Sequence, residues 1–162
     1  MQLEAIRPAN SLKVHPNMKY SKLNELSIEL SGLGLGCLQL GGYGWGKVSE
    51  REIVKAIHKA IDSGITLFDT APIYGLGQSE ESLGKALGVK RKEVIIGTKV
   101  GLTWKNNKTF KKYTNSSKAN IEKEIDVSLR RLKTDYIDLY QIHWPDPDTA
   151  IEDTFLAMEK LK

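Results

Sequence analysis

Apolar residues along the chain follow two alternating patterns, and together these predict strands and helices in turn. Short apolar runs typical of buried parallel strands occur at Gly34–Leu38, Ile65–Phe68, Val94–Lys99 and Tyr136–Ile142. After each run, apolar residues return every three or four positions, as on one face of a helix. In the last such segment they are Ile151, Phe155, Met158 and Leu161. The pattern therefore predicts four successive βα units.

Start and stop signals set the expected bounds of these helices. Capping boxes are expected at Ser49-x-x-Glu52 and Thr149-x-x-Glu152, and Ser79 is expected to cap the second helix. The third helix is expected to carry Ile121, Ile125, Leu129 and Leu132 on one face. Glycines that follow helices favour their termination, here Gly64 and Gly88.

Two segments lie outside the βα pattern. Loose alternation over Tyr20–Leu30, with a polar turn at Asn24–Glu25, predicts a β-hairpin, and Gly101–Ser116 is expected to be a polar loop. Residues 1–17 show no pattern and are expected to be an unstructured extension, with the domain beginning at Met18 and running to residue 162.

Alternating strands and helices imply a parallel sheet with right-handed crossovers. A doubly wound open sheet and a (β/α) barrel both fit the pattern. Four units in 162 residues amount to half of an eight-unit barrel, which needs ~250 residues.

Composition excludes several classes of protein. The net charge is +4 and the pI about 9.0, but the lysines are scattered, so we expect no nucleic-acid partner. The single cysteine, Cys37, allows no intrachain disulfide and favours a reducing compartment, the cytoplasm. No apolar run approaches the ~20 residues of a membrane span, so no membrane association is expected. No metal site is expected either.

Four reactive side chains lie where the predicted strands end. They are Asp69, Tyr74, Lys99 and His143, and the carboxyl ends of parallel strands share one rim. A phenol near an ammonium can donate a proton to a carbonyl oxygen, a carboxylate keeps the ammonium in place, and an imidazole can orient the carbonyl. Each residue taken alone also fits a structural role. Trp45 and Trp144 fit packing and pocket walls equally.

Several long motifs, in order, resemble the aldo-keto reductase family. They are Gly34-Leu35-Gly36-Cys37-x-x-Leu40-Gly41, Phe68-Asp69-Thr70-Ala71-x-x-Tyr74-Gly75, Ser79-Glu80-x-x-Leu83-Gly84-x-Ala86-Leu87, Thr98-Lys99, and Asp135-Tyr136-Ile137-Asp138-Leu139-Tyr140-x-Ile142-His143. The resemblance covers roughly residues 18–162 and implies the N-terminal half of a TIM-type barrel. His143-Trp144-Pro145-Asp146-Pro147 is similar to the bacterial and plant branches.

The resemblance implies reduction of aldehydes or ketones by a nicotinamide cofactor, usually NADPH, on a small carbonyl substrate. It makes Asp69, Tyr74, Lys99 and His143 a catalytic tetrad. Cys37 and Leu38 stand where many members have Thr-Trp, and with Asp69 they are expected to contact the cofactor. Trp45 and Trp144 are expected to line the substrate pocket. The glycine-rich segment Gly41–Gly46 precedes a polar helix cap and is not expected to cradle phosphate.

The sequence stops inside the fourth predicted helix, so we expect it to lack the half that grips most of the cofactor. A non-catalytic remnant of the family is therefore an alternative, and a binding module like the potassium-channel β-subunits is a further one. The expected sheet edges at Gly34–Leu38 and Tyr136–Ile142, together with the apolar face of the last helix, predict self-association.

Overall fold

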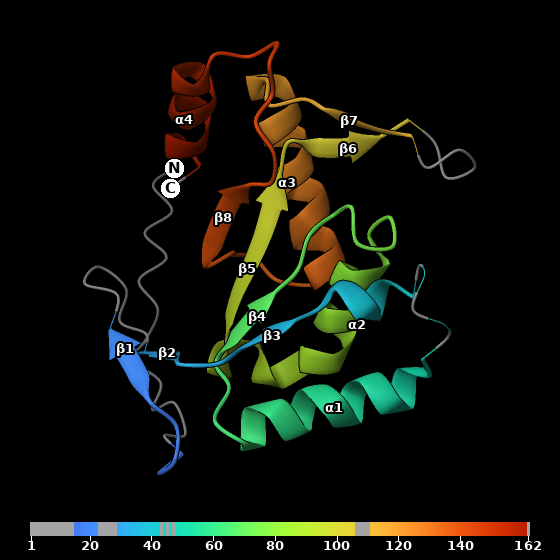
Figure 1. Cartoon of the computed structure of the whole chain (residues 1–162), viewed down its shortest axis with the longest axis vertical. Coiled ribbons are helices and arrows are strands. Elements are labelled where there is room, and N and C mark those ends of the chain that lie inside the picture. Colours follow the sequence, from blue (N-terminus) through green and yellow to red (C-terminus); the bar gives the residue numbers. More distant parts are fainter. Residues whose placement is uncertain are drawn as a thin grey trace.

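The computed structural model of the protein describes residues 15–22, 29–42, 44, 46, 48–105 and 111–161. A parallel sheet in the order β3-β4-β5-β8 forms its centre (Figure 1). Its strands are β3 (Gly34–Gly36), β4 (Leu67–Asp69), β5 (Ile95–Val100) and β8 (Leu139–Ile142). Neighbours in the sheet are thus consecutive units of the chain. A doubly wound sheet would instead reverse its order at a switch point, so this order is that of a barrel wall.

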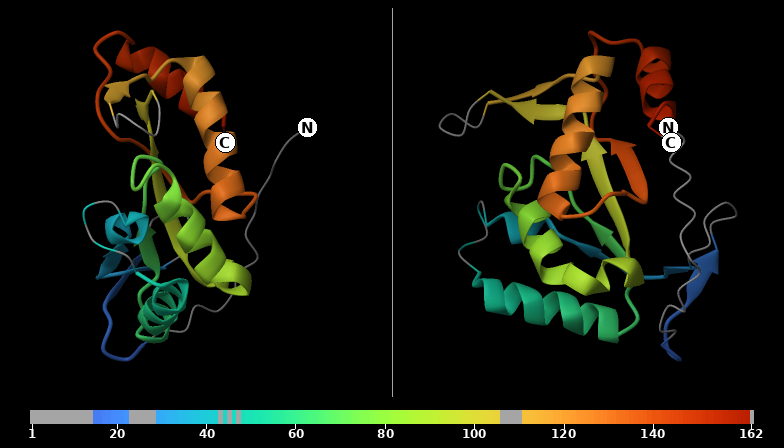
Figure 2. Two further views of the ribbon diagram at one scale, coloured as in Figure 1. Left: turned by 90° about the vertical axis from the view of Figure 1, so that its right-hand side faces the viewer. Right: turned by 180° about the vertical axis from the view of Figure 1, so that it is seen from behind.

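A helix follows each of these strands. The helices are α1 (Glu50–Asp62), α2 (Gln78–Leu87), α3 (Lys118–Leu132) and α4 (Ile151–Glu159). Consecutive helices pack against one another, α1 on α2, α2 on α3 and α3 on α4. Figure 2 shows α1, α2 and α3 along one face of the sheet. The four βα units therefore form an inner sheet and an outer helical layer, as predicted for part of a barrel.

The main hydrophobic core lies between the first two helices and the sheet. Phe68, Ile96 and Leu83 are fully buried in it, and Ile57 of α1 and Leu132 of α3 complete its sides. A smaller cluster lies beneath α3 and α4 and contains Val100, Ile121 and Ala157. The fourth unit is thus packed by fewer apolar side chains than the first three.

The predicted start and end of the first helix are confirmed. Ser49 Oγ accepts a hydrogen bond from the Glu52 amide, while Glu52 Oε2 accepts one from the Ser49 amide at 3.1 Å, which completes a capping box. Gly64 follows with φ +85°, and a Cβ there would lie 2.5 Å from His15 Cβ. His15, which belongs to the predicted extension, also donates its amide to Tyr20 Oη. Residues 1–14 lie outside the described residues.

Two predicted helix caps are wrong. Helix α2 begins at Gln78 after Gly77, and Ser79 lies buried inside its first turn, where its hydroxyl donates to the Cys37 carbonyl at 2.6 Å. At α4 the cap is Ala150, and Thr149 Oγ1 donates to Asp146 Oδ2 instead of closing a capping box. Each hydroxyl thus bonds to a group outside its own helix: Ser79 to the Cys37 carbonyl, 42 residues earlier, and Thr149 to the Asp146 carboxylate, three residues earlier in the same loop.

The predicted N-terminal hairpin is confirmed by the antiparallel strands β1 (Tyr20–Lys22) and β2 (Glu29–Ser31), while its expected turn at Asn24–Glu25 lies outside the described residues. Ser31 and Thr66 exchange two bonds, amide to hydroxyl in each direction, at 2.8 and 2.9 Å. Thr66 precedes β4, so the hairpin docks at the amino ends of the barrel strands.

The segment predicted as a loop at Gly101–Ser116 contains a second hairpin, formed by β6 (Leu102–Trp104) and β7 (Lys112–Thr114). Its strands form because Leu102 is buried against Ala71 and Ile73 of the loop after β4. Residues 106–110 lie outside the described part of the chain. The hairpin projects from the carboxyl end of the sheet (Figure 1).

Three predicted strands are shorter than expected, and the second covers Leu67–Asp69 rather than Ile65–Phe68. The first ends at Gly36, and Leu38 instead opens a 3₁₀-helix, Leu38–Gly41. The fourth begins only at Leu139, because the residues before it bind a buried arginine. Arg91 donates to the Tyr136 carbonyl at 3.0 Å and pairs with Asp138 at 2.9 Å. It belongs to a second 3₁₀-helix, Gly88–Glu93. Among the helices the structure describes, none has the length and apolar character to cross a membrane.

Candidate active site

The four predicted tetrad residues lie at the carboxyl ends of three neighbouring strands. Asp69 is the last residue of β4, and Tyr74 lies in the loop that follows it. Lys99 is the penultimate residue of β5, and His143 directly follows β8. Parallel pairing of β4 with β5 and of β5 with β8 brings these strand ends to one rim.

The ammonium of Lys99 is the centre of the cluster. It donates to Asp69 Oδ1 at 2.7 Å and to the Thr70 carbonyl at 2.9 Å, and a longer contact of 3.4 Å reaches Tyr74 Oη. The Lys99 side chain is 14% exposed and that of Asp69 is 42% exposed. The ion pair therefore holds the ammonium beside the phenol at a partly shielded site. This is the geometry that the sequence predicted.

The His143 ring also packs against Tyr74. The two rings meet edge to face with centroids 5.8 Å apart, and the His143 amide donates to the Val100 carbonyl at 2.9 Å. Burial, and then the positive charge of Lys99, lower the pKa of His143 below its usual value, while Asp69 opposes this effect. The imidazole is therefore neutral at neutral pH and can donate or accept a hydrogen bond.

The loop that carries Tyr74 is held by close backbone contacts. A Cβ on Gly41 would lie 2.7 Å from the carbonyl carbon of Tyr74, so only glycine permits this approach. The Ser79 amide also donates to the Tyr74 carbonyl at 3.2 Å, and the Ser79 hydroxyl lies 2.9 Å from Thr70 Oγ1. The first turn of α2 thus fixes both ends of the Asp69–Tyr74 segment.

The residues predicted to contact the cofactor lie next to this cluster. Cys37 is buried, its amide donates to the Asp69 carbonyl at 2.8 Å, and its carbonyl accepts the Ser79 hydroxyl. Burial raises the pKa of the Cys37 thiol to about 12, so the thiol stays protonated. Leu38 is 40% exposed beside the rim. Contact of these residues with a cofactor stays a prediction.

Of the two tryptophans predicted to line the substrate pocket, Trp144 is 51% exposed, and its ring lies 6.4 Å from that of His143. Trp45 lies outside the described residues. Sequence reasoning missed Trp104. This side chain is partly buried and, like Tyr74, packs against the small apolar cluster of Ala71, Ile73 and Leu102. The alternation in Leu102-Thr103-Trp104 was the available signal, but the polar residues around it concealed it.

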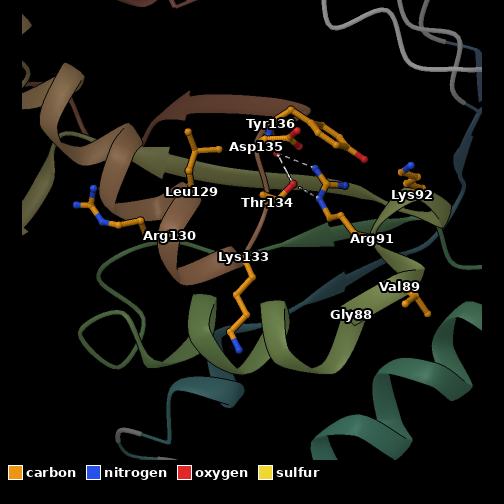
Figure 3. Close-up of a pocket in the computed structure, with 10 residues that line it drawn as sticks. All are labelled: Gly88, Val89, Arg91, Lys92, Leu129, Arg130, Lys133, Thr134, Asp135 and Tyr136. Carbon is orange, nitrogen blue, oxygen red and sulfur yellow. Dashed lines mark hydrogen bonds between the residues drawn. The ribbon is translucent and has the colours of Figure 1, made fainter.

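A hollow of about 540 Å³ opens at the other end of the sheet (Figure 3). Its lining comes from the segments before β5 and β8 and includes Arg91, Thr134 and Tyr136. Arg91 Nε donates to Thr134 Oγ1 at 3.1 Å, so this arginine holds the chain together here. The amino-terminal face of a barrel serves stability, and the hollow is remote from the tetrad. The described residues contain no cluster of three or more His, Cys, Asp or Glu side chains arranged to hold a metal ion.

Comparison with known sequences supports the geometry. The sequence model of the Aldo/keto reductase family matches residues 32–162. The aldo-keto reductase YhdN of Bacillus subtilis is 49% identical over 146 residues, which are 89% of this chain and 43% of that protein. The NADH-specific methylglyoxal reductase of Escherichia coli is 38% identical, over 90% of this chain and 48% of the relative. The chain therefore spans slightly less than half the length of these relatives.

Solved structures give the same result. A glycerol dehydrogenase from Gluconobacter oxydans superposes with a TM-score of 0.79 at 41% identity, over 88% of this chain and 44% of its own. An aldo-keto reductase from Bacillus halodurans in its holo form superposes with a TM-score of 0.79 at 37% identity, over 90% of this chain and 46% of its own. With the order of the strands and the residues at their carboxyl ends, these matches show that the chain belongs to the aldo/keto reductase family.

Proposed function

We propose that this chain supplies the proton-transfer site of an enzyme that reduces aldehydes or ketones to alcohols with a nicotinamide cofactor. The observation that carries the proposal is the position of the Lys99 ammonium, 2.7 Å from Asp69 and 3.4 Å from the Tyr74 phenol, at the carboxyl rim. In barrels of this type, that rim is where reacting residues lie.

Tyr74 is the proton donor in this proposal. A phenol is a weak acid at neutral pH, and a neighbouring positive charge stabilises the phenolate that remains after the proton leaves. Lys99 supplies that charge from beside Tyr74 Oη. Asp69 and the Thr70 carbonyl hold the ammonium so that it cannot turn away into solvent.

His143 orients the carbonyl oxygen toward the Tyr74 phenol. Its ring is close to that of Tyr74, and its lowered pKa keeps it uncharged at neutral pH. A neutral imidazole can donate one hydrogen bond to the carbonyl oxygen without competing with Tyr74 for the proton transfer. Trp144, exposed beside His143, forms a wall of the substrate pocket in this proposal.

A bound nicotinamide cofactor supplies the hydride that the carbonyl carbon receives. The rim fits such a group, because the proton donor and the orienting imidazole converge there and Leu38 presents an exposed apolar side chain beside them. Cys37, Leu38 and Asp69 would hold the nicotinamide end. We propose NADPH as the cofactor, from the resemblance. Because the Escherichia coli relative is an NADH-specific reductase, NADH must be tested beside NADPH.

The substrate proposed is a small carbonyl compound. The relatives' names, a methylglyoxal reductase and a glycerol dehydrogenase, fit this class. We also propose a cytoplasmic location, because the single cysteine allows no intrachain disulfide. Because the chain spans less than half of these relatives, activity is proposed for a complete barrel that contains it, whether the remaining units come from one chain or from another.

Fluorescence titration with NADPH and NADH tests the proposal, with carbonyl-dependent oxidation of the cofactor as the second readout. The 162-residue chain is measured alone and joined to the C-terminal half of a relative. We expect weak cofactor binding by the chain alone, and binding with turnover by the complete barrel. A complete barrel that binds the cofactor but reduces no aldehyde or ketone would favour the alternative, a non-catalytic member of the family.

A further inference from the structure

Two loops that follow the neighbouring strands β5 and β8 both contact Tyr74 of the candidate site. The connection after β5 forms the β6–β7 hairpin, whose residues Leu102 and Trp104 pack on the segment that carries Tyr74. The loop after β8 carries His143 and Trp144. Side chains from both loops therefore lie beside Tyr74.

Asp146 joins the two loops. Its Oδ2 accepts the Ser116 amide at 2.7 Å, and its Oδ1 accepts the Thr114 hydroxyl at 3.4 Å. Both donors belong to the other connection, at the point where β7 leads into α3. The same carboxylate accepts two donors from its own loop, the Thr149 hydroxyl at 2.8 Å and the Asp148 amide at 3.2 Å.

The chemistry of this contact requires a carboxylate. All four partners are donors, and an ionised carboxylate has acceptor sites for each of them, whereas an amide side chain replaces one acceptor with a donor. The Ser116 amide, the largest influence, holds the pKa of Asp146 below its usual value. The Ser116 carbonyl is engaged as well, because it accepts the Thr154 hydroxyl of α4 at 3.4 Å. The segment around Ser116 is thus bound to the fourth unit at two points.

We propose that Asp146 is a positioning residue that fixes the His143–Trp144 loop against the β6–β7 hairpin and so sets the opening through which the carbonyl substrate enters. The substrate part of this inference rests on the proposed function, and the link between the loops does not. Without the carboxylate, the loop must be ordered each time a substrate binds. That cost falls equally on the bound substrate and the transition state, so it raises KM and leaves kcat nearly unchanged.

The test compares Asp146→Asn with Asp148→Asn, which removes the same charge two residues away and keeps the amide that donates to Asp146. Hydrogen exchange at the Ser116 amide is measured on the chain itself, and the emission of Trp144 is measured in a background in which Trp45 and Trp104 are replaced by phenylalanine. We expect Ser116 exchange to accelerate about tenfold in Asp146→Asn relative to Asp148→Asn, because the amide then has at best a neutral acceptor in place of a charged one. Trp144 emission should move to longer wavelength in Asp146→Asn alone. Unchanged exchange and emission would overturn the link.

The kinetic readout uses the complete barrel. Asp146→Asn should raise the KM for the carbonyl several-fold while kcat and the cofactor Kd change by less than twofold. Equal losses in kcat and kcat/KM would overturn the substrate role even if the exchange result holds. A wild-type barrel that does not turn over refutes the proposed function and the substrate role, whereas the exchange result still decides the link. If Asp146→Asn fails to fold, Thr149→Val, which removes one donor to the same oxygen, should give the same changes at smaller size.

Discussion

The first three βα units and the fourth unit differ in how they are packed. Phe68, Ile96 and Leu83 lie fully buried in the larger core, beneath α1 and α2. The fourth unit contributes to a much smaller cluster, and Phe155 and Leu156 of α4 are 59% and 55% exposed. The Tyr74 phenol and the Lys99 ammonium of the candidate site thus lie on the well-packed part, whereas the His143 imidazole lies on the weakly packed part.

Polar groups follow the same division. Beneath α2, the buried carboxylate of Glu80 accepts the Thr98 hydroxyl at 2.7 Å and pairs with Arg131 at 3.2 Å. In the fourth unit, by contrast, the buried hydroxyl of Tyr140 in β8 has no hydrogen-bond partner among the described residues. A buried polar group without a partner costs free energy of folding. The comparison therefore predicts that the fourth unit opens more readily than the rest, and that His143 is less firmly placed than Lys99.

Replacing one phenylalanine in each part gives the largest expected contrast. Phe68→Ala removes a fully buried ring from the main core and should lower the free energy of unfolding by about 3–5 kcal/mol. Phe155→Ala removes a ring that is 59% exposed and should lower it by less than about 1 kcal/mol. Denaturant unfolding at low protein concentration measures both. Similar losses in the two variants would contradict the difference in packing.

The exposed apolar surface of the fourth unit should also drive self-association. Ile151, Phe155 and Leu156 form an apolar surface on α4, next to β8, which pairs only with β5 among the described strands. Light scattering of the 162-residue chain should therefore show a mass that rises with concentration. The double variant Phe155→Ser and Leu156→Ser should reduce it. Val89→Ser serves as the control, because Val89 is 98% exposed at the opposite end of the sheet. A monodisperse monomer at every concentration would exclude this behaviour.

Titration of His143 tests whether Lys99, on the well-packed part, acts electrostatically on the imidazole of the fourth unit. Burial and then Lys99 lower its pKa, so Lys99→Met should raise it toward the ordinary value of 6.5. The lowered pKa has a consequence for stability. The unfolded chain binds this proton first as pH falls, so His143 reduces the stability of the fold progressively below about pH 6.5.

Nuclear magnetic resonance of the imidazole protons measures the pKa. The control is Lys118→Met, which removes a positive charge from a residue whose side chain is 60% exposed on α3. If the pKa of His143 does not move in Lys99→Met, or moves equally in Lys118→Met, then Lys99 does not act on the imidazole.

The smallest expected contrast concerns two serine caps. Ser49 caps α1 through its side chain, whereas Ser117 caps α3 with no side-chain hydrogen bond. Ser49→Ala should lower the free energy of unfolding by about 1 kcal/mol, and Ser117→Ala should lower it by clearly less. Thermal unfolding of both variants gives the comparison, and a larger loss from Ser117→Ala would show that the first helix is not the better capped one.

The sequence predicted those features that depend on residues near one another in the chain. Four βα units, the N-terminal hairpin and the Ser49 capping box all follow from local periodicity and short motifs. The convergence of Asp69, Tyr74, Lys99 and His143 was also predictable, because carboxyl ends of parallel strands share a rim.

What the sequence did not predict depends on contacts between distant segments. Ser79 resembles a helix cap, but its hydroxyl bonds to Cys37, 42 residues earlier. The β6–β7 hairpin forms because Leu102 finds an apolar surface beside Tyr74, which a polar local sequence conceals. Only the fold shows that Asp146 accepts the Ser116 amide, 30 residues away.

The proposed function depends above all on proton transfer through Tyr74 at the carboxyl rim. The most direct measurement is single-turnover reduction of an aldehyde by the complete barrel with cofactor already bound. The comparison is Tyr74→Phe against Tyr136→Phe, which removes a phenol at the opposite end of the strands and keeps the ring on Arg91. We expect Tyr74→Phe to lower the rate of reduction by about 10²–10⁴-fold without weakening cofactor binding, and Tyr136→Phe to react like the wild type. A Tyr74→Phe variant that reduces the aldehyde at the wild-type rate would contradict the proposed proton transfer.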